Sequence, residues 1–232
     1  MIVAAYDEAD RIAATLDGLA AAFAGARVWV ADDGSTDETA ALARSLGARV
    51  VRSERVIGKG AAMTLAAREA LREVELGAGD EPAPVFVLCD ADLAASAAQL
   101  APLAEAVRAG EADLAVAAFA RRVGGGVGLA LGFARWAIAR RCGFEASAPI
   151  SGQRALSGAT LSDVLPFAAG YGMEIGMTID AVRAGHRVVE IELDLSHRAS
   201  GRTLSGFAHR GRQLIDFTRA YLARRGPGRR ST

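Results

Sequence analysis

Short apolar runs alternate with amphipathic segments of helical period over the first hundred residues. Residues 10–24, for example, place Ile12, Leu16 and Leu19 on one helical face. The pattern predicts helices at 10–24, 37–46 and 61–76, and strands at 1–5, 28–31, 48–52 and 85–89. Continuous apolar strands that alternate with helices are typical of a mostly parallel sheet covered on both faces.

The second half of the chain is less regular. The pattern there predicts helices at 96–109, 129–141, 174–184 and 204–225, strands at 114–119 and 188–195, and a mobile loop at the glycine run 124–128. A chain of 232 residues is the right length for one α/β domain. We therefore expect a single-domain, three-layer α/β/α sandwich over residues 1–225, followed by a disordered tail at 226–232.

Composition narrows the class of protein. Hydrophobic residues make up 51% of the chain, and 27 basic residues balance 27 acidic ones, as in a globular protein. No apolar stretch is long enough to span a bilayer, no secretory pattern is present, and two cysteines form no disulfide framework. We expect a cytoplasmic protein with no nucleic-acid partner. A homodimer stays an open alternative, as does peripheral contact between the arginine-rich C-terminal part and the inner face of a membrane.

Polar clusters follow the predicted strands of the first half. Because the carboxyl ends of parallel strands meet at one edge of a sheet, where ligands bind, we expect these clusters to converge. They are Tyr6-Asp7-Glu8, Asp32-Asp33, Gly58-Lys59-Gly60 and Asp90-Ala91-Asp92.

The Asp90-Ala91-Asp92 cluster is a candidate metal site. Both carboxylates can reach one divalent cation, and Mg²⁺ or Mn²⁺ suits hard oxygen ligands and a diphosphate. His197, just past a predicted strand, is a candidate to complete the site. Taken alone, the Asp-x-Asp pattern also fits a polar turn that caps the next helix.

Lys59 is the only lysine in the chain and lies between two glycines before a predicted helix. Such a position offers a charge and backbone N–H groups to a phosphate, although the same tripeptide also fits a surface turn. Asp32, at a strand end, is a candidate to accept hydrogen bonds from a nucleobase or ribose.

The order and spacing of Ala-Tyr-Asp-Glu-Ala, Ala-Asp-Asp-Gly-Ser-Thr-Asp, Gly-Lys-Gly-Ala-Ala and Cys-Asp-Ala-Asp-Leu resemble family 2 and related GT-A glycosyltransferases. The resemblance implies a GT-A (Rossmann-like) fold in which residues 1–100 bind a nucleotide-diphospho-sugar and residues 101–203 bind the acceptor. Asp7 stands where the family usually has Asn. The implied donor-site residues are Ala5, Tyr6, Glu8 and Asp32 around the nucleoside, Lys59 at the phosphates, and Asp90, Ala91 and Asp92 at the sugar and metal.

Two segments of the second half resemble different enzymes. Gly170-Tyr171-Gly172-Met173-Glu174 and His197-Arg198 resemble segments of glucosyl-3-phosphoglycerate and mannosylglycerate synthases, which retain anomeric configuration. Ser151-Gly152-Gln153-Arg154 is similar to a segment of polyprenyl-phosphate glycosyltransferases, whose acceptor is a lipid phosphate. The two resemblances imply different acceptors.

We therefore expect a metal-dependent hexosyltransferase that uses UDP-glucose, or GDP-mannose, and a phosphate-bearing or hydroxyl acceptor. The candidate catalytic residues are Asp92, Glu174 and Arg154: Glu174 would be a base in an inverting reaction or a positioning group in a retaining one, and Arg154 would hold an acidic acceptor. The alternatives are a polyprenyl-phosphate glycosyltransferase at the membrane surface, a sugar-1-phosphate nucleotidyltransferase, which the lack of glycine at 2–12 disfavours, and a non-catalytic nucleotide- or membrane-binding protein.

Overall fold

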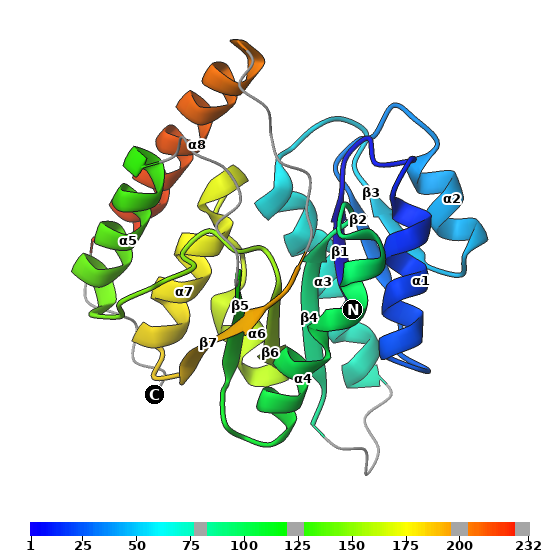
Figure 1. The fold of residues 1–232 in the computed structure, drawn as a ribbon, viewed down its shortest axis with the longest axis horizontal. Coiled ribbons are helices and arrows are strands. Elements are labelled where there is room, and N and C mark those ends of the chain that lie inside the picture. The colour runs from blue at the N-terminus through cyan, green and yellow to red at the C-terminus, as the bar shows by residue number, and fades with distance from the viewer. Residues whose placement is uncertain (77–82, 120–127, 196–203, 226–232) are drawn as a thin grey trace.

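The computed structural model describes residues 1–76, 83–119, 128–195 and 204–225 (Figure 1), with side chains of the last segment described from Leu214 onward. Over these residues seven strands form one sheet in the order β3-β2-β1-β4-β6-β5-β7. The strands are β1 (Ile2–Ala5), β2 (Trp29–Asp32), β3 (Arg49–Arg52), β4 (Val85–Asp90), β5 (Leu114–Phe119), β6 (Arg154–Ser157) and β7 (Val188–Leu193).

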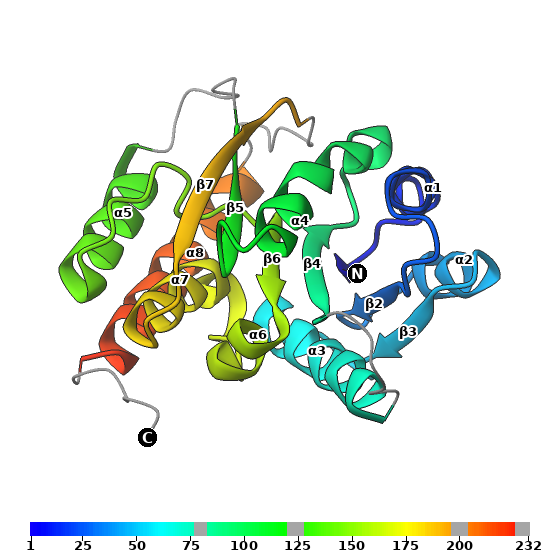
Figure 2. The ribbon, with the colours of Figure 1, turned by 90° about the horizontal axis from the view of Figure 1, so that it is seen from below.

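Helices cover both faces of the sheet (Figure 2), so the predicted three-layer α/β/α architecture is confirmed. One face packs against α1 (Ile12–Ala22), α2 (Thr39–Ser45), the 3₁₀ helix η1 (Ala94–Leu100) and α4 (Ala101–Arg108). The other face packs against α3 (Lys59–Leu76), α6 (Gly158–Val164) and α7 (Met173–Arg183), which the 3₁₀ turn η2 (Gly170–Gly172) precedes. The helices α5 (Gly128–Cys142) and α8 (Leu204–Ala223) pack on the outside of α7.

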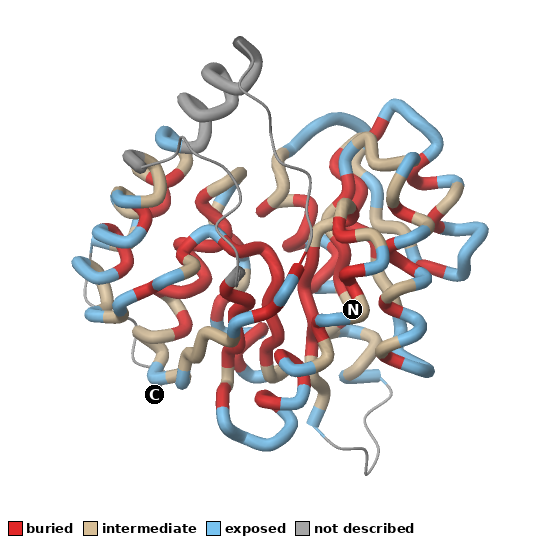
Figure 3. The backbone as a smooth tube through the Cα atoms, viewed as in Figure 1, coloured by how far each residue is buried: buried red, intermediate tan, exposed pale blue. Residues whose placement is uncertain are grey.

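The central strands β1, β4 and β5 are almost entirely apolar because both of their faces are buried (Figure 3), whereas the edge strands β3 and β7 carry charged residues. Successive side chains of a strand point to opposite faces, so Val87 joins the core under α1 and α4, whereas Leu88 joins the core under α3 and α7. The parallel register of β1 with β2 and β4 brings the ends of these strands to one rim of the sheet.

The strand β6 and the helix α6 were not predicted. β6 has four residues, begins with a charged residue and is too short to show a strand period. It runs antiparallel to both of its neighbours, β4 and β5, so its first residue lies at the rim where the parallel strands end.

The continuous helix predicted at 96–109 was wrong. The segment is the 3₁₀ helix η1 followed by α4, and Pro102 occupies the first turn of α4. Proline has no N–H to continue a preceding α-helix, but it is tolerated in a first turn, so the α-helix starts at this point.

Two further expectations concern membrane-spanning helices and disulfides. None of the helices in the described residues is long and apolar enough to cross a membrane. Cys89 and Cys142 are both free, and Cys89 is buried. The glycines at 124–126 and the tail at 226–232 lie outside the described residues, and the division into donor and acceptor halves stays a prediction.

Candidate functional site

The polar clusters that follow β1, β2 and β4 lie at one rim of the sheet, as predicted, and α3 delivers Lys59 to the same place. The convergence follows from the parallel register, since Ala5 pairs with Asp32 and Ala4 pairs with Asp90. The site therefore begins as a row of strand ends.

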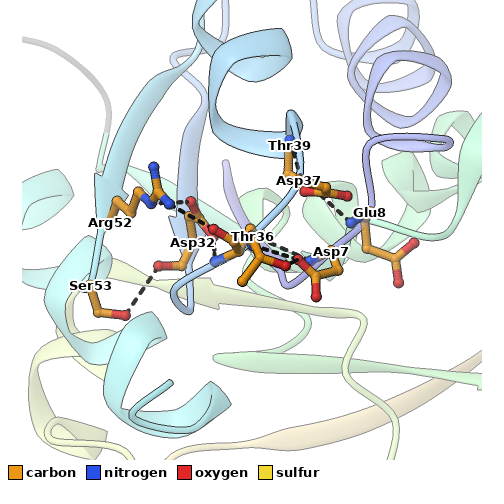
Figure 4. Close-up of polar contacts among 9 residues, drawn as sticks. Asp7, Glu8, Asp32, Thr36, Asp37, Thr39, Arg52 and Ser53 are labelled. Carbon is orange, nitrogen blue, oxygen red and sulfur yellow. Dashed lines mark hydrogen bonds and ion pairs between the residues drawn. The ribbon is translucent and has the colours of Figure 1, made fainter. Parts of the chain in front are cut away.

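The turns after β1 and β2 are locked together (Figure 4). The backbone N–H of Asp7 donates to Ser35 Oγ at 3.0 Å, and Asp7 Oδ1 accepts from the N–H of Thr36 at 2.7 Å. Asp7 has a positive φ of 50°, a conformation that Asp and Asn adopt more readily than other side chains. Aspartate thus meets the backbone requirement at the position where the family usually has Asn.

Asp37 supplies the hydrogen bonds that start α2. Its Oδ1 accepts from Thr39 N at 3.0 Å and its Oδ2 accepts from Ala9 N at 3.1 Å, so one carboxylate joins the turn after β1 to α2. Burial alone would raise the pKa of Asp37, but the hydrogen bonds to Thr39 and Ala9 outweigh it and lower this pKa below its ordinary value.

Asp32 is fully buried at the end of β2. Its Oδ1 accepts from Ser35 N at 2.9 Å, and its Oδ2 lies 3.3 Å from Arg52 Nε. The expectation that Asp32 contacts a nucleoside stays untested, and in this structure its carboxylate is committed to the turn and to Arg52. Tyr6, at the same rim, is 47% exposed and leaves a ring face available for a base.

Asp33 was overlooked at the sequence level, where it appeared only as part of an acidic turn. Its Oδ1 accepts from Ile57 N at 2.7 Å, and its Oδ2 accepts from Gly58 N at 2.9 Å. Asp33 therefore fixes the loop that leads into Lys59 and α3.

Lys59 lies at the centre of the site. Its Nζ is 2.6 Å from Asp90 Oδ1 and 2.8 Å from Glu174 Oε1. Burial by itself lowers the pKa of the Lys59 ammonium, but the carboxylates of Asp90 and Glu174 outweigh burial and hold this pKa above its ordinary value. The ammonium therefore stays charged and joins the first half of the chain to the second.

The segment before β6 covers this ion-pair cluster. Gln153 Nε2 donates to Asp90 Oδ2 at 2.9 Å, while Ser151 Oγ donates to Gln153 Oε1 at 3.2 Å. A Cβ on Gly152 would lie 2.6 Å from Asp90 Oδ2 and 2.8 Å from Lys59 Nζ. Glycine at 152 therefore lets the backbone approach the Asp90–Lys59 ion pair more closely than a residue with a Cβ would allow. Gln153 stood in a motif noted from the sequence but was given no role there.

Arg154 is fully buried beneath the site rather than exposed in it. Its Nε donates to Ser151 O at 2.8 Å and its Nη1 donates to Thr178 Oγ1 at 3.0 Å, and Thr178 Oγ1 in turn donates to Glu174 O at 3.1 Å. Burial lowers the pKa of the Arg154 guanidinium to about 10, so it is still a cation at neutral pH. In this conformation Arg154 does not present its guanidinium to an acceptor, and it supports Glu174 and the Ser151 turn from inside.

Ala5 and Ala91 are buried, and their neighbouring backbone groups are used within the fold. Ala5 O accepts from Asp33 N at 3.0 Å, Ala91 N donates to Ala4 O at 2.9 Å, and Ala91 O accepts from Thr15 Oγ1 at 2.6 Å. Their contact with a donor stays a prediction, and the structure shows them as part of the floor of the site. Glu8 lies at the rim, where its backbone N–H donates to Thr39 Oγ1 at 2.8 Å.

Asp90 and Asp92 are the candidate ligands of a hard divalent cation. Asp90 is the last residue of β4, and its side chain is about one-third exposed. The carboxylates of Asp90 and Glu174 both contact the single ammonium of Lys59, so added positive charge would be stabilised there. The described residues contain no group of three metal-ligating side chains, and His197 and Arg198 lie outside those residues.

Comparison with known proteins places this geometry among sugar-transferring enzymes. Residues 1–148 match the family described as glycosyl transferase family 2. The glucosyl-3-phosphoglycerate synthase of Mycolicibacterium paratuberculosis is 29% identical to this chain over 242 aligned positions, which cover 93% of this chain and 69% of the relative.

Crystal structures of glucosyl-3-phosphoglycerate synthase from Mycobacterium tuberculosis are similar to this one. A complex with phosphoglyceric acid has a TM-score of 0.71 and 29% sequence identity, over 96% of this chain and 78% of that chain. A complex with Mn²⁺, UDP-glucose and phosphoglyceric acid has a TM-score of 0.69 and 28% identity, over the same shares. A complex with Mg²⁺ and UDP has a TM-score of 0.69 and 29% identity, over 94% of this chain and 77% of that chain.

Proposed function

Since the chain belongs to glycosyl transferase family 2, we propose that it transfers glucose from UDP-glucose to a small acceptor that carries a phosphate and a carboxylate. The bridge formed by Lys59 between Asp90 and Glu174 carries this proposal. It brings a cation and two carboxylates from three separate elements to one point at the rim of the sheet. The similar M. tuberculosis enzyme binds UDP-glucose, Mn²⁺ and phosphoglyceric acid together.

The balance of charge explains why donor binding would require a divalent ion. Asp90 and Glu174 bring two carboxylates and Lys59 brings one ammonium, so the charge at this point is net negative and repels a diphosphate. Asp90 and Asp92 would hold Mg²⁺ or Mn²⁺, which would supply positive charge to the diphosphate leaving group. The solved relatives hold Mn²⁺ or Mg²⁺ with UDP or UDP-glucose.

Lys59 and the start of α3 would stabilise the departing diphosphate. The helix begins at Lys59, and the positive end of its dipole favours an anion there, although Ala61 N and Ala62 N already donate to Gly58 O. The raised pKa of Lys59 keeps its ammonium charged at neutral pH, so it can stabilise charge on the leaving group. Tyr6 would pack on the uracil ring from the other side of the rim.

Glu174 would position hydroxyl groups at the reacting centre. One of its oxygens already accepts from Lys59, and its backbone carbonyl accepts from Thr178, so the side chain is held in one place. Arg154 would act through this arrangement, as a positioning residue beneath Glu174 and the Ser151 turn, and not by direct contact with the acceptor.

Calorimetric titration tests the donor half of the proposal. The protein would be titrated with UDP, UDP-glucose, GDP and GDP-mannose, with Mn²⁺ or with EDTA, and the titration repeated on Asp92→Asn. Asp17→Asn, an exposed change on α1, is the matched control. We expect micromolar binding of UDP and UDP-glucose with Mn²⁺, lost with EDTA and in Asp92→Asn but kept in Asp17→Asn. Preference for GDP would overturn the choice of donor.

A product assay tests the acceptor. The expected result is transfer of glucose to 3-phosphoglyceric acid, and no transfer to a short-chain polyprenyl phosphate. The opposite result would favour the polyprenyl-phosphate alternative, which is based on the Ser151–Arg154 segment. The burial of Arg154 disfavours that alternative, because the guanidinium cannot meet a lipid phosphate in this conformation.

A further inference from the structure

The outer surface of α5 and α8 exposes large apolar side chains. Trp136 on α5 and Leu214, Ile215 and Leu222 on α8 are each between 39% and 52% exposed. These side chains do not contribute to the cores of the sheet, which lie on the other side of α7. We call the surface formed by the four residues the α5–α8 face.

The two helices form one continuous surface. The ring centroids of Trp136 and Tyr221 lie 4.9 Å apart, and the guanidinium of Arg141 lies 3.6 Å from the centroid of the Tyr221 ring. Figures 1 and 2 both show α5 and α8 side by side at the end of the molecule opposite α1 and α2. Exposed apolar groups of two helices thus share a single side of the protein.

Positive charge dominates the sequences of the two helices. The sequence of α5 contains no acidic residue, and that of α8 contains one, Asp216. Asp216 is mostly buried: its Oδ2 accepts from Tyr171 N at 3.2 Å, and its Oδ1 lies 3.7 Å from Nη1 of the exposed Arg219. The whole chain has as many acidic as basic residues, so this imbalance is local. The exposed arginines are Arg135, Arg140, Arg219 and Arg225.

We propose that the α5–α8 face docks the protein on the surface of an anionic lipid bilayer. Helices that lie in a membrane interface combine Trp, Leu and Ile on one side with Arg that meets lipid phosphates. The same features disfavour a second copy of this chain as occupant. A two-fold contact places a patch against itself, and here it would place arginines against arginines.

Docking would also hold the site at a fixed position relative to the bilayer. Asp216 is mostly buried on α8, where it contacts Tyr171 and lies against Gly170. These two residues directly precede α7, which begins with Met173 and Glu174. The helix α8 would therefore contact the lipid surface with its exposed residues, while Asp216 contacts the turn that precedes Glu174. This inference does not depend on the identity of donor or acceptor.

Vesicle flotation tests the proposal on the full chain. We expect the protein to float with phosphatidylcholine vesicles in which about one lipid in three is phosphatidylglycerol. With vesicles of pure phosphatidylcholine it should stay in solution. Binding should weaken when salt is raised, because arginine–lipid attraction is screened.

Two pairs of substitutions separate the charged from the apolar contribution. Arg140→Glu with Arg225→Glu should weaken binding by at least about tenfold, since each basic residue near an anionic surface contributes about 1 kcal/mol. The control, Arg44→Glu with Arg108→Glu, changes the same charge on exposed positions elsewhere. Ile215→Ser with Leu222→Ser should also weaken binding, whereas Leu46→Ser with Leu65→Ser, at similarly exposed positions, should not.

Three outcomes would overturn the proposal. One is failure of the full chain to bind anionic vesicles at low salt. Another is an equal loss of binding in the control pairs. The third is a dimer in light scattering that Ile215→Ser with Leu222→Ser converts to a monomer, which would assign the face to a second copy. Thermal unfolding verifies that each variant folds. Titration with the donor should give the same affinity for each variant as for the unchanged chain, so a loss of vesicle binding is distinguished from a failure of the proposed function.

Discussion

The ends of β1 and β2 form the predicted donor side of the site, where carboxylates accept hydrogen bonds from backbone N–H groups of the same or a neighbouring turn. The predicted acceptor side is formed by Gln153, Arg154 and Glu174, whose side chains are held mostly by other side chains. The comparison shows two ways to build a rigid site, one through bonds to the backbone and one through bonds between side chains. Lys59 belongs to both, because it pairs with Asp90 and with Glu174.

Removing Lys59 should have the largest effect, since this breaks the link between the two sides. Lys59→Ala should lower kcat/KM for glucose transfer by about 10²- to 10³-fold, the usual result of removing one group that stabilises transition-state charge. Steady-state kinetics with UDP-glucose measures this loss. Arg68→Ala, an exposed change on the same helix, is the control. A loss below tenfold for Lys59→Ala would show that the leaving group does not depend on the ammonium.

Arg154→Ala tests whether the buried guanidinium holds Glu174 and the Ser151 turn in position. The substitution removes a fully buried side chain with its hydrogen bonds to Ser151 O and Thr178 Oγ1, so the free energy of unfolding should fall by about 3 kcal/mol. Chemical denaturation measures it. In the folded variant kcat should fall while KM for the acceptor changes little, because Arg154 acts through Glu174. A rise in acceptor KM alone would instead indicate direct acceptor contact.

Gly152→Ala tests the space beside the ion-pair cluster. The added Cβ would lie 2.6 Å from Asp90 Oδ2, so the carboxylate must shift. We expect roughly a tenfold loss of kcat/KM, about 1.4 kcal/mol in transition-state stabilisation, with a nearly unchanged unfolding temperature. Gly132→Ala, where a Cβ meets nothing within 4 Å, should leave activity unchanged.

Asp37→Ala should have the smallest effect on stability and activity, because several separate hydrogen bonds hold the turns of the predicted donor side. Loss of the hydrogen bonds to Thr39 N and Ala9 N should cost about 1 kcal/mol of stability. The pKa of Asp37 is lowered in the folded protein, so its contribution is present above the ordinary pKa of an aspartate and is lost as the pH falls through the lowered value. Chemical denaturation at pH 7 and at pH 3 measures the free energy of unfolding of both proteins. The difference in this free energy between Asp37→Ala and the unchanged chain should be smaller at pH 3 than at pH 7.

The contrast between the two sides also explains what could be predicted from the sequence. The strand-and-helix order of the first half, its parallel sheet and the convergence of its polar clusters were predicted, because each cluster directly follows an apolar strand. The partners of Lys59 and Asp90 on the other side were not. Glu174 is 115 residues from Lys59 and Gln153 is 63 residues from Asp90, and a short antiparallel strand without a clear period brings the second pair together.

The burial of Arg154 was also missed. From the sequence, an arginine beside a glycine and a glutamine indicates a group that contacts a phosphate, since arginine is seldom fully buried. The structure instead places it on the first residue of a central strand, between two packed layers. Only the position of β6 in the sheet determines this, and a four-residue strand gives no pattern from which to derive it.

The central position of β6 has a consequence for synthesis of the chain on the ribosome. β1 to β4 emerge first and can pair with each other, but β4 then has an open edge until β6, its other neighbour, has been made. At ordinary translation rates, the residues from Asp90 to Arg154 take about 3 to 13 s to appear. During that time an apolar strand edge is available to pair with another chain. The nascent protein should therefore depend most on chaperones when β1 to β4 have been made and β6 has not.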